Sequence, residues 1–97
     1  RQQRQFDEAF EQVQQALTLL PIEHTERAYS YLVLGVIELD KHNWQQSADF
    51  FRQSLDLWQK EKDHRLMAWS LTNLGAALRP QGKAEEAIAA YKQAIIL

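Results

Sequence analysis

The sequence contains no cysteine, only 2 prolines and only 3 glycines. The absence of cysteine excludes disulfide bonds, thiolate zinc sites and a cysteine nucleophile. The scarcity of proline and glycine, together with 45% apolar and 25% charged residues, favours a folded helical chain over a disordered one. With 97 residues, the chain is long enough for one small domain with its own core.

The sequence also lacks an excess of one charge and a long apolar run. Its 11 basic and 13 acidic residues give a net charge of −2, which provides no positive surface for a phosphate backbone or an anionic membrane. The longest apolar run, residues 32–37, is interrupted by Gly35 and is far shorter than the roughly 20 residues of a membrane span. No signal peptide is visible. We therefore expect a cytoplasmic protein that binds neither nucleic acid nor membrane.

Two blocks of the sequence recur at a fixed spacing, which is typical of repeat proteins. The block Ala28-Tyr-Ser-Tyr-Leu-Val-Leu-Gly35 aligns with Ala68-Trp-Ser-Leu-Thr-Asn-Leu-Gly75, forty residues later. Trp44-Gln-Gln-Ser-Ala-Asp-Phe-Phe51 aligns with Ala84-Glu-Glu-Ala-Ile-Ala-Ala-Tyr91 at the same spacing, and Phe6-Asp-Glu-Ala-Phe-Glu-Gln-Val13 precedes the Trp44 block by thirty-eight residues. The sequence thus predicts one domain over residues 1–97, with a half unit at 1–21 and full units at 25–61 and 65–97.

Each unit has the apolar spacing of two helices. Apolar residues recur at intervals of three and four, as in Phe51, Leu55 and Trp58, and strand-like alternation is missing. Pro21 and the Pro80-Gln-Gly82 segment mark helix ends. We predict an all-α fold of about five antiparallel helices, near residues 4–20, 25–41, 44–60, 65–79 and 83–96.

These blocks resemble the tetratricopeptide repeat family, whose motif combines a Leu-Gly pair in the first helix with aromatic and small residues in the second. The matching residues are Tyr31, Leu34, Gly35, Trp44, Ser47, Phe51 and Ser54 in the middle unit, and Leu71, Leu74, Gly75, Ala84, Ala87, Tyr91 and Ala94 in the last. The resemblance implies a right-handed α–α superhelix, or solenoid. The units exceed the usual length of about 34 residues by roughly one helical turn. In this they are similar to the units of kinesin light chain and of large bacterial signalling regulators.

The Leu-Gly pairs indicate close packing between the two helices of each unit. A glycine inside a helix costs about 1 kcal/mol relative to alanine, so its presence at two equivalent positions indicates a steric need. We expect Gly35 to face Ser47 and Gly75 to face Ala87. The large residues around these contacts are expected to be Leu34 with Phe51 and Leu74 with Tyr91.

No arrangement of residues in the sequence indicates catalysis. His24, His42 and His64 are too far apart in sequence for the paired ligands of a helical metal site. The adjacent acids Asp7-Glu8 and Glu85-Glu86 begin helices, where the helix dipole favours negative charge. We therefore predict no catalytic residue, no metal site and no cofactor.

The resemblance instead implies a binding site for protein or peptide on the concave face, which the first helix of each unit lines. The residues implied are Tyr29, Leu32, Val36, Leu39 and Asp40 in the middle unit, and Trp69, Thr72, Asn73, Ala76 and Arg79 in the last. Tyr29 and Trp69 occupy equivalent positions, and exposed aromatic side chains are frequent anchors for a partner. Some members bind a terminal carboxylate through lysine, asparagine and arginine, but Leu32 and Val36 replace two of those residues here, which favours an apolar ligand.

The leading prediction is a scaffold that binds a peptide, helix or subunit in this apolar concave groove. The alternative is a sensor segment of a larger signalling or transcription-regulating protein, which flanking domains would reveal. The missing initial methionine and the apolar ending Ala94-Ile95-Ile96-Leu97 indicate a piece of a longer chain. Because both solenoid ends would expose apolar surface, we also expect self-association.

Overall fold

The computed structural model describes residues 2–19 and 24–97. Within these ranges the chain forms five α-helices and one short 3-10 helix, without a strand. The elements are α1 (Gln2–Leu19), α2 (His24–Asp40), α3 (Trp44–Glu61), α4 (His64–Leu78), η1 (Arg79–Gln81) and α5 (Ala84–Ile96). The prediction of an all-α fold with five helices is confirmed, and every predicted boundary lies within about two residues of the observed one. The proline break predicted at Pro21 lies outside the described residues.

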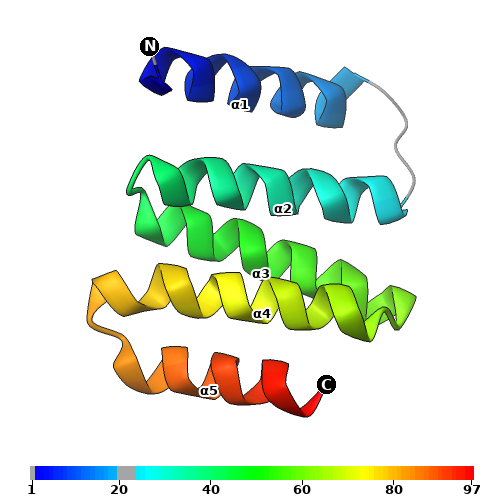
Figure 1. The fold of residues 1–97 in the computed structure, drawn as a ribbon. Coiled ribbons are helices and arrows are strands. Elements are labelled where there is room, and N and C mark those ends of the chain that lie inside the picture. The colour runs from blue at the N-terminus through cyan, green and yellow to red at the C-terminus, as the bar shows by residue number, and fades with distance from the viewer. Residues whose placement is uncertain (1, 20–23) are drawn as a thin grey trace.

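The helices follow one another as a row of antiparallel neighbours (Figure 1). The chain measures 35 × 31 × 15 Å along its principal axes, which is a thin slab. In this row α2 and α4 are the first helices of the two full units, and α3 and α5 are the second helices. A slab of this shape is expected of a helical repeat, in which each unit contacts chiefly its neighbours.

Three helix ends share one turn geometry at intervals of twenty residues. His42, Lys62 and Gly82 all adopt left-handed backbone conformations, with φ of 65°, 57° and 75°. At each turn the amide of this residue donates to the carbonyl three residues earlier, and the next amide donates to the carbonyl five residues earlier. This is the Schellman pattern that ends many helices. Only the third position is glycine, which is why the turn at residues 61–64 has no obvious signal in the sequence.

The two largest buried side chains, Trp58 and Phe51, both come from α3. Phe51 belongs to a core cluster with Leu32 of α2 and with Leu71 and Leu74 of α4. Trp58 belongs to a second cluster that links α2 to α4 through Ala28 and Leu66. The apolar core is therefore continuous from α2 across α3 to α4, and α3 is the element that joins the two units.

The two helical glycines make room for aromatic rings. A Cβ at Gly35 would lie 2.6 Å from Phe51 Cε1, and a Cβ at Gly75 would lie 2.6 Å from Tyr91 Cε1. Ser47 does contact Gly35, because its Oγ donates a hydrogen bond of 2.7 Å to the Gly35 carbonyl. Ser47 therefore faces Gly35 as expected, and the contact of Gly75 with Ala87 stays a prediction. The steric need for glycine comes from the rings of Phe51 and Tyr91, which occupy the space in which a side chain would lie.

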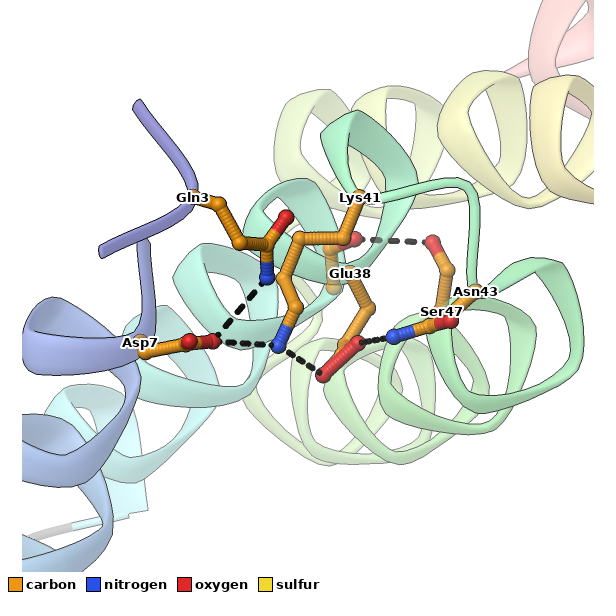
Figure 2. A network of polar contacts seen from close by, with 7 residues as sticks. Gln3, Asp7, Glu38, Lys41, Asn43 and Ser47 are labelled. Carbon is orange, nitrogen blue, oxygen red and sulfur yellow. Dashed lines mark hydrogen bonds and ion pairs between the residues drawn. The ribbon is translucent and has the colours of Figure 1, made fainter. Parts of the chain in front are cut away.

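A polar network attaches α1 to the end of α2 (Figure 2). Lys41 Nζ lies 2.9 Å from Asp7 Oδ1 of α1, 3.6 Å from Glu38 Oε1 and 5.5 Å from the centroid of the Phe10 ring. The hydrogen bond between Lys41 and Asp7 lowers the pKa of the Asp7 carboxyl and raises the pKa of Lys41. Phe10 also contacts Phe50 of α3 edge-on, at 5.9 Å between ring centroids. One lysine and one phenylalanine thus hold α1 against the α2–α3 hairpin.

The Glu38 carboxylate of this network is buried, although the second unit has a leucine at the position equivalent to Glu38. Glu38 is 5% exposed and lies forty residues before Leu78, which is 2% exposed. A buried carboxylate requires hydrogen-bond partners. Asn43 Nδ2 donates to Glu38 Oε2 at 2.7 Å, and Lys41 supplies the nearby positive charge. The sequence comparison between the units did not identify Glu38 as part of the core.

The ring contacts predict that Gly35→Ala and Gly75→Ala differ in cost. Helix propensity alone favours alanine by about 1 kcal/mol at both positions. Phe51 is fully buried and would lie 2.6 Å from the new Cβ, so Gly35→Ala should destabilise the fold by about 1–3 kcal/mol from overpacking. The Tyr91 ring is only partly buried, so Gly75→Ala should cost less. Thermal melting measures both, and equal melting temperatures for the two variants would contradict this account.

The polar network predicts that Lys41→Ala loosens α1 selectively. Removing the ammonium leaves Asp7 and Glu38 facing each other without a cation, and the contact to Phe10 is lost as well. We expect amide hydrogen exchange in residues 2–19 to become faster by roughly tenfold, with α3 and α4 unchanged. Lys60→Ala is the matched control, because among the described residues Lys60 pairs only with the exposed Asp56 on its own helix. Uniform acceleration across all helices in Lys41→Ala would show that the network stabilises the whole fold instead.

Candidate functional site

The predicted binding residues of α4 and η1 form one stripe along the helix. Trp69, Thr72, Asn73 and Ala76 recur at intervals of three and four, so they lie on one side of α4, and Arg79 continues the stripe into η1. Trp69 is 51% exposed. The Thr72 hydroxyl donates to the Ala68 carbonyl at 2.9 Å and is therefore used within the helix. The exposed residues of the stripe are Trp69, Thr72 and Arg79.

On α2, two predicted residues, Tyr29 and Asp40, are exposed, two are half-buried and one is in the core. Tyr29 is 44% exposed, and its ring meets Trp58 edge-on at 4.7 Å between centroids. Val36 and Leu39 are half-buried against the core. Leu32 is only 3% exposed and clusters with Leu71 and Leu74 of α4. The expectation that Leu32 lines an open groove is wrong, because the core between α2, α3 and α4 includes its side chain.

One exposed apolar residue on α2 was missed. Val33 is 46% exposed, and it stands forty residues before Asn73. The same spacing pairs Leu32 with Thr72 and Val36 with Ala76. Applying the forty-residue offset to every position of the α4 stripe would have identified Val33 in addition to Leu32.

Two hollows flank Trp69. One, of about 400 Å³, is lined by Tyr29, Arg65, Leu66 and Trp69 and lies between α2 and α4. The other, of about 490 Å³, lies between α4 and α5, and its lining is Ala68, Trp69, Thr72, Tyr91, Ala94 and Ile95. A third hollow of about 330 Å³ is bounded by Ala76, Arg79 and Pro80. The Trp69 side chain therefore lies between two apolar depressions and lines both of them.

The hollow between α4 and α5 corresponds to a place that is filled in the first unit. Its lining residues Ala68, Thr72, Tyr91 and Ala94 stand forty residues after Ala28, Leu32, Phe51 and Ser54, all of which are at most 3% exposed. There α4 covers them, with Leu66 against Ala28 and Ser70 Oγ 3.4 Å from Ser54 Oγ. The hollow thus has the shape and the apolar lining that receive a helix elsewhere in this chain.

Asn73 carries a buried polar group beneath this face. Its side-chain Nδ2 is buried and has no hydrogen-bond partner within the described part of the chain. A buried amide donor without an acceptor is uncommon in folded proteins. Asn73 Nδ2 is therefore an unsatisfied donor beneath the surface, out of contact with solvent.

The described residues show no arrangement for metal-dependent chemistry. Across residues 2–19 and 24–97, no group of three or more His, Asp or Glu side chains is placed to hold a metal ion. His42 stacks on the Trp44 ring at 4.8 Å between centroids, and His24 Nδ1 lies 3.3 Å from Glu61 Oε2. No helix in the same ranges combines the length and the apolar composition needed to cross a membrane.

The fold and the repeated stripe define an α-helical repeat protein. A family model described as tetratricopeptide repeat matches residues 25–95, from the start of α2 to near the end of α5. The chain therefore belongs to the tetratricopeptide repeat family, as its Leu-Gly pairs predicted. Comparison with curated proteins gave no match. Comparison with solved structures gave none either.

The open hollow leads us to propose that the 97-residue polypeptide self-associates through α4 and α5. Ile95 lines that hollow and is 81% exposed, which favours contact with a second copy. Sedimentation velocity at high micromolar concentration should detect dimers or larger species, and Ile95→Lys should shift them toward monomer. Ile88→Lys is the control, because Ile88 is an exposed apolar residue of α5 outside the hollow. A monomeric parent, or equal effects of the two lysines, would contradict the proposal.

Proposed function

We propose that this chain is a protein-interaction scaffold and that a peptide, helix or subunit binds across α2 and α4. The observation that supports this most is the placement of Trp69, which is half-exposed between two apolar hollows. A tryptophan in such a position presents a large, rigid surface whose burial by a partner is strongly favourable. The proposal treats residues 1–97 as one binding domain of a cytoplasmic protein.

The position of Trp69 relative to the core supports a binding role over a packing role. The family motif residues Leu74 and Gly75 on the same helix are buried, whereas Trp69 points away from that core. In the first unit Tyr29 has the equivalent position and is exposed to a similar extent. Two equivalent aromatic residues thus remain accessible beside helices whose Leu-Gly pairs are buried.

The α2 side of the face is apolar. Tyr29 and Val33 are exposed, and Val36 and Leu39 are half-buried next to them. This row suits the apolar side of an amphipathic helix or an extended apolar segment.

The serine hydroxyls support binding over nucleophilic catalysis. Ser47 donates to the Gly35 carbonyl, Ser54 to the Ala28 carbonyl and Ser30 to the Glu26 carbonyl. A serine nucleophile requires an adjacent general base, and these hydroxyls are instead occupied by backbone carbonyls. Their arrangement is that of small packing residues in a helical repeat.

The proposal predicts that Trp69→Ala separates binding from stability. At a side chain that is half-exposed, truncation should change the free energy of unfolding by about 0.5 kcal/mol. Loss of a central anchor should weaken partner binding by about 2 kcal/mol, roughly thirtyfold. Thermal melting and titration with peptides captured from a lysate measure the two effects.

Trp58→Ala is the contrasting variant for this test. Trp58 is 1% exposed, so its truncation should cost about 3–5 kcal/mol of stability. If Trp69→Ala melts as low as Trp58→Ala, the indole is a core residue. If Trp69→Ala stays folded and binds every captured peptide as the parent does, the face loses its proposed anchor.

A further inference from the structure

We propose that the partner bound on this face is an acidic segment, with carboxylates against Arg65 and Arg79 and an apolar side chain in the hollow beside Trp69. The inference rests on the proposed function and adds the chemical class of the partner. It follows from the distribution of charge along α4 and from the place of its two flanking arginines in the hollows.

The helix at the centre of the face has no acidic residue. Between His64 and Leu78 the sequence of α4 contains neither Asp nor Glu, and the side chain of Asp63 is used to cap the helix by accepting from the Leu66 amide. Each of the other four α-helices carries at least two acidic residues. The exposed positive charges of α4 and η1 therefore have no counter-charge on their own elements.

Arg65 and Arg79 are also without partners from neighbouring elements. The exposed Arg52 pairs with Asp49 and Glu86, and Lys41 pairs with Asp7 and Glu38. In the described ranges no ion pair or hydrogen bond involves the side chain of Arg65 or Arg79. Both guanidinium groups remain available to a carboxylate from outside the chain.

Acidic residues near the two ends of the stripe do not neutralise it. Glu61, close in sequence to Arg65, accepts a hydrogen bond of 2.9 Å from Thr25 and lies 3.3 Å from His24. Asp40 ends α2 at the same end of the slab as Arg79 (Figure 1), and it forms no ion pair with that arginine. The stripe on α4 is thus locally positive in a chain whose net charge is −2.

The two arginines stand at opposite ends of the same stripe, and each borders a hollow. Arg65 lines the hollow with Tyr29, Leu66 and Trp69, and Arg79 lines the one with Ala76 and Pro80. Fourteen residues of helix separate them by about 21 Å. An extended segment of about six residues spans that distance. The spacing therefore suits a short acidic peptide that lies along α4.

The hollow next to Arg65 is the reason why the proposed partner segment carries an apolar residue beside its acidic residues. Its lining of Tyr29, Leu66 and Trp69 provides aromatic and aliphatic contacts in about 400 Å³, enough for a large apolar side chain. A carboxylate on the adjacent residue would then meet the Arg65 guanidinium, whose planar donors match both oxygens. Exclusion of water by the apolar side chain strengthens this ion pair.

Synthetic peptides test the inference. The probe is a fluorophore-labelled peptide with a central pair of leucines flanked on both sides by glutamates, and the matched probes replace the glutamates by glutamines or by lysines. We expect the glutamate peptide to bind most tightly and the lysine peptide most weakly. The affinity of the glutamate peptide should fall with added salt, because exposed ion pairs are screened.

Substitution of the two arginines tests whether the preference for the glutamate peptide comes from Arg65 and Arg79. Arg65→Gln and Arg79→Gln should each weaken the glutamate peptide by roughly threefold and together by roughly tenfold, and leave the glutamine peptide unaffected. Lys92→Gln is the charge-matched control, because Lys92 is an exposed cation of α5 that lines none of the hollows around the stripe. The salt dependence should be lost in the double arginine variant and retained in Lys92→Gln.

Different outcomes would contradict the acidic partner and the binding face. Equal affinity for the glutamate and glutamine peptides, with binding still lost in Trp69→Ala, would overturn the acidic partner and leave the binding face in place. Preference for the lysine peptide would overturn the inference as well. If the folded parent binds none of the peptides, the acidic segment is excluded, and the titration of Trp69→Ala with captured partners decides the proposed function separately.

Discussion

The contact between an aromatic ring and the backbone of a glycine governs the geometry of each helical hairpin. Phe51 lies against Gly35 and Tyr91 lies against Gly75, at distances that leave no room for a Cβ. Because a ring at this distance permits only one register of the two helices, the side chains that face away from the hairpin also have determined positions. Tyr29 and Trp69 occur on the same side of the slab because they stand six residues before these two glycines. The binding face is in this sense a consequence of hairpin packing.

The two units share this contact but differ in how their outer sides are covered. In the first unit α4 lies over Phe51 and Ser54 and buries both. In the second unit the equivalent Tyr91 and Ala94 line an open hollow. A repeat protein buries apolar surface through its neighbours, so equivalent motif positions are core in one unit and accessible in the next. Exposure within this chain therefore depends on position in the row as well as on residue type.

Electrostatics also distinguish parts that the repeat pattern makes equivalent. At the N-terminal side, Lys41 lies among Asp7, Glu38 and Phe10, and its charge serves to attach α1. On α4, Arg65 lies beside aromatic and aliphatic side chains with no acid on the same helix. Charge that is paired within the chain contributes to the fold, whereas charge left unpaired beside an apolar hollow is available for recognition. The chain has both kinds, one at the end of α2 and the other on α4.

The sequence by itself determined the helices, the forty-residue repeat and the family, because helical spacing and the Leu-Gly pairs are local signals that neighbouring residues carry. It also identified Trp69 and Tyr29, since their equivalence follows from the repeat. Only the tertiary structure decided that Leu32 is core and Val33 exposed, because the packing of α4 over the first unit, and not residue type, determines which of two adjacent apolar residues is covered. Likewise, only the tertiary structure showed that Glu38 is buried with Asn43 and Lys41 as partners, because a charged residue is buried where three-dimensional neighbours satisfy it, and those neighbours come from a turn and from a separate helix.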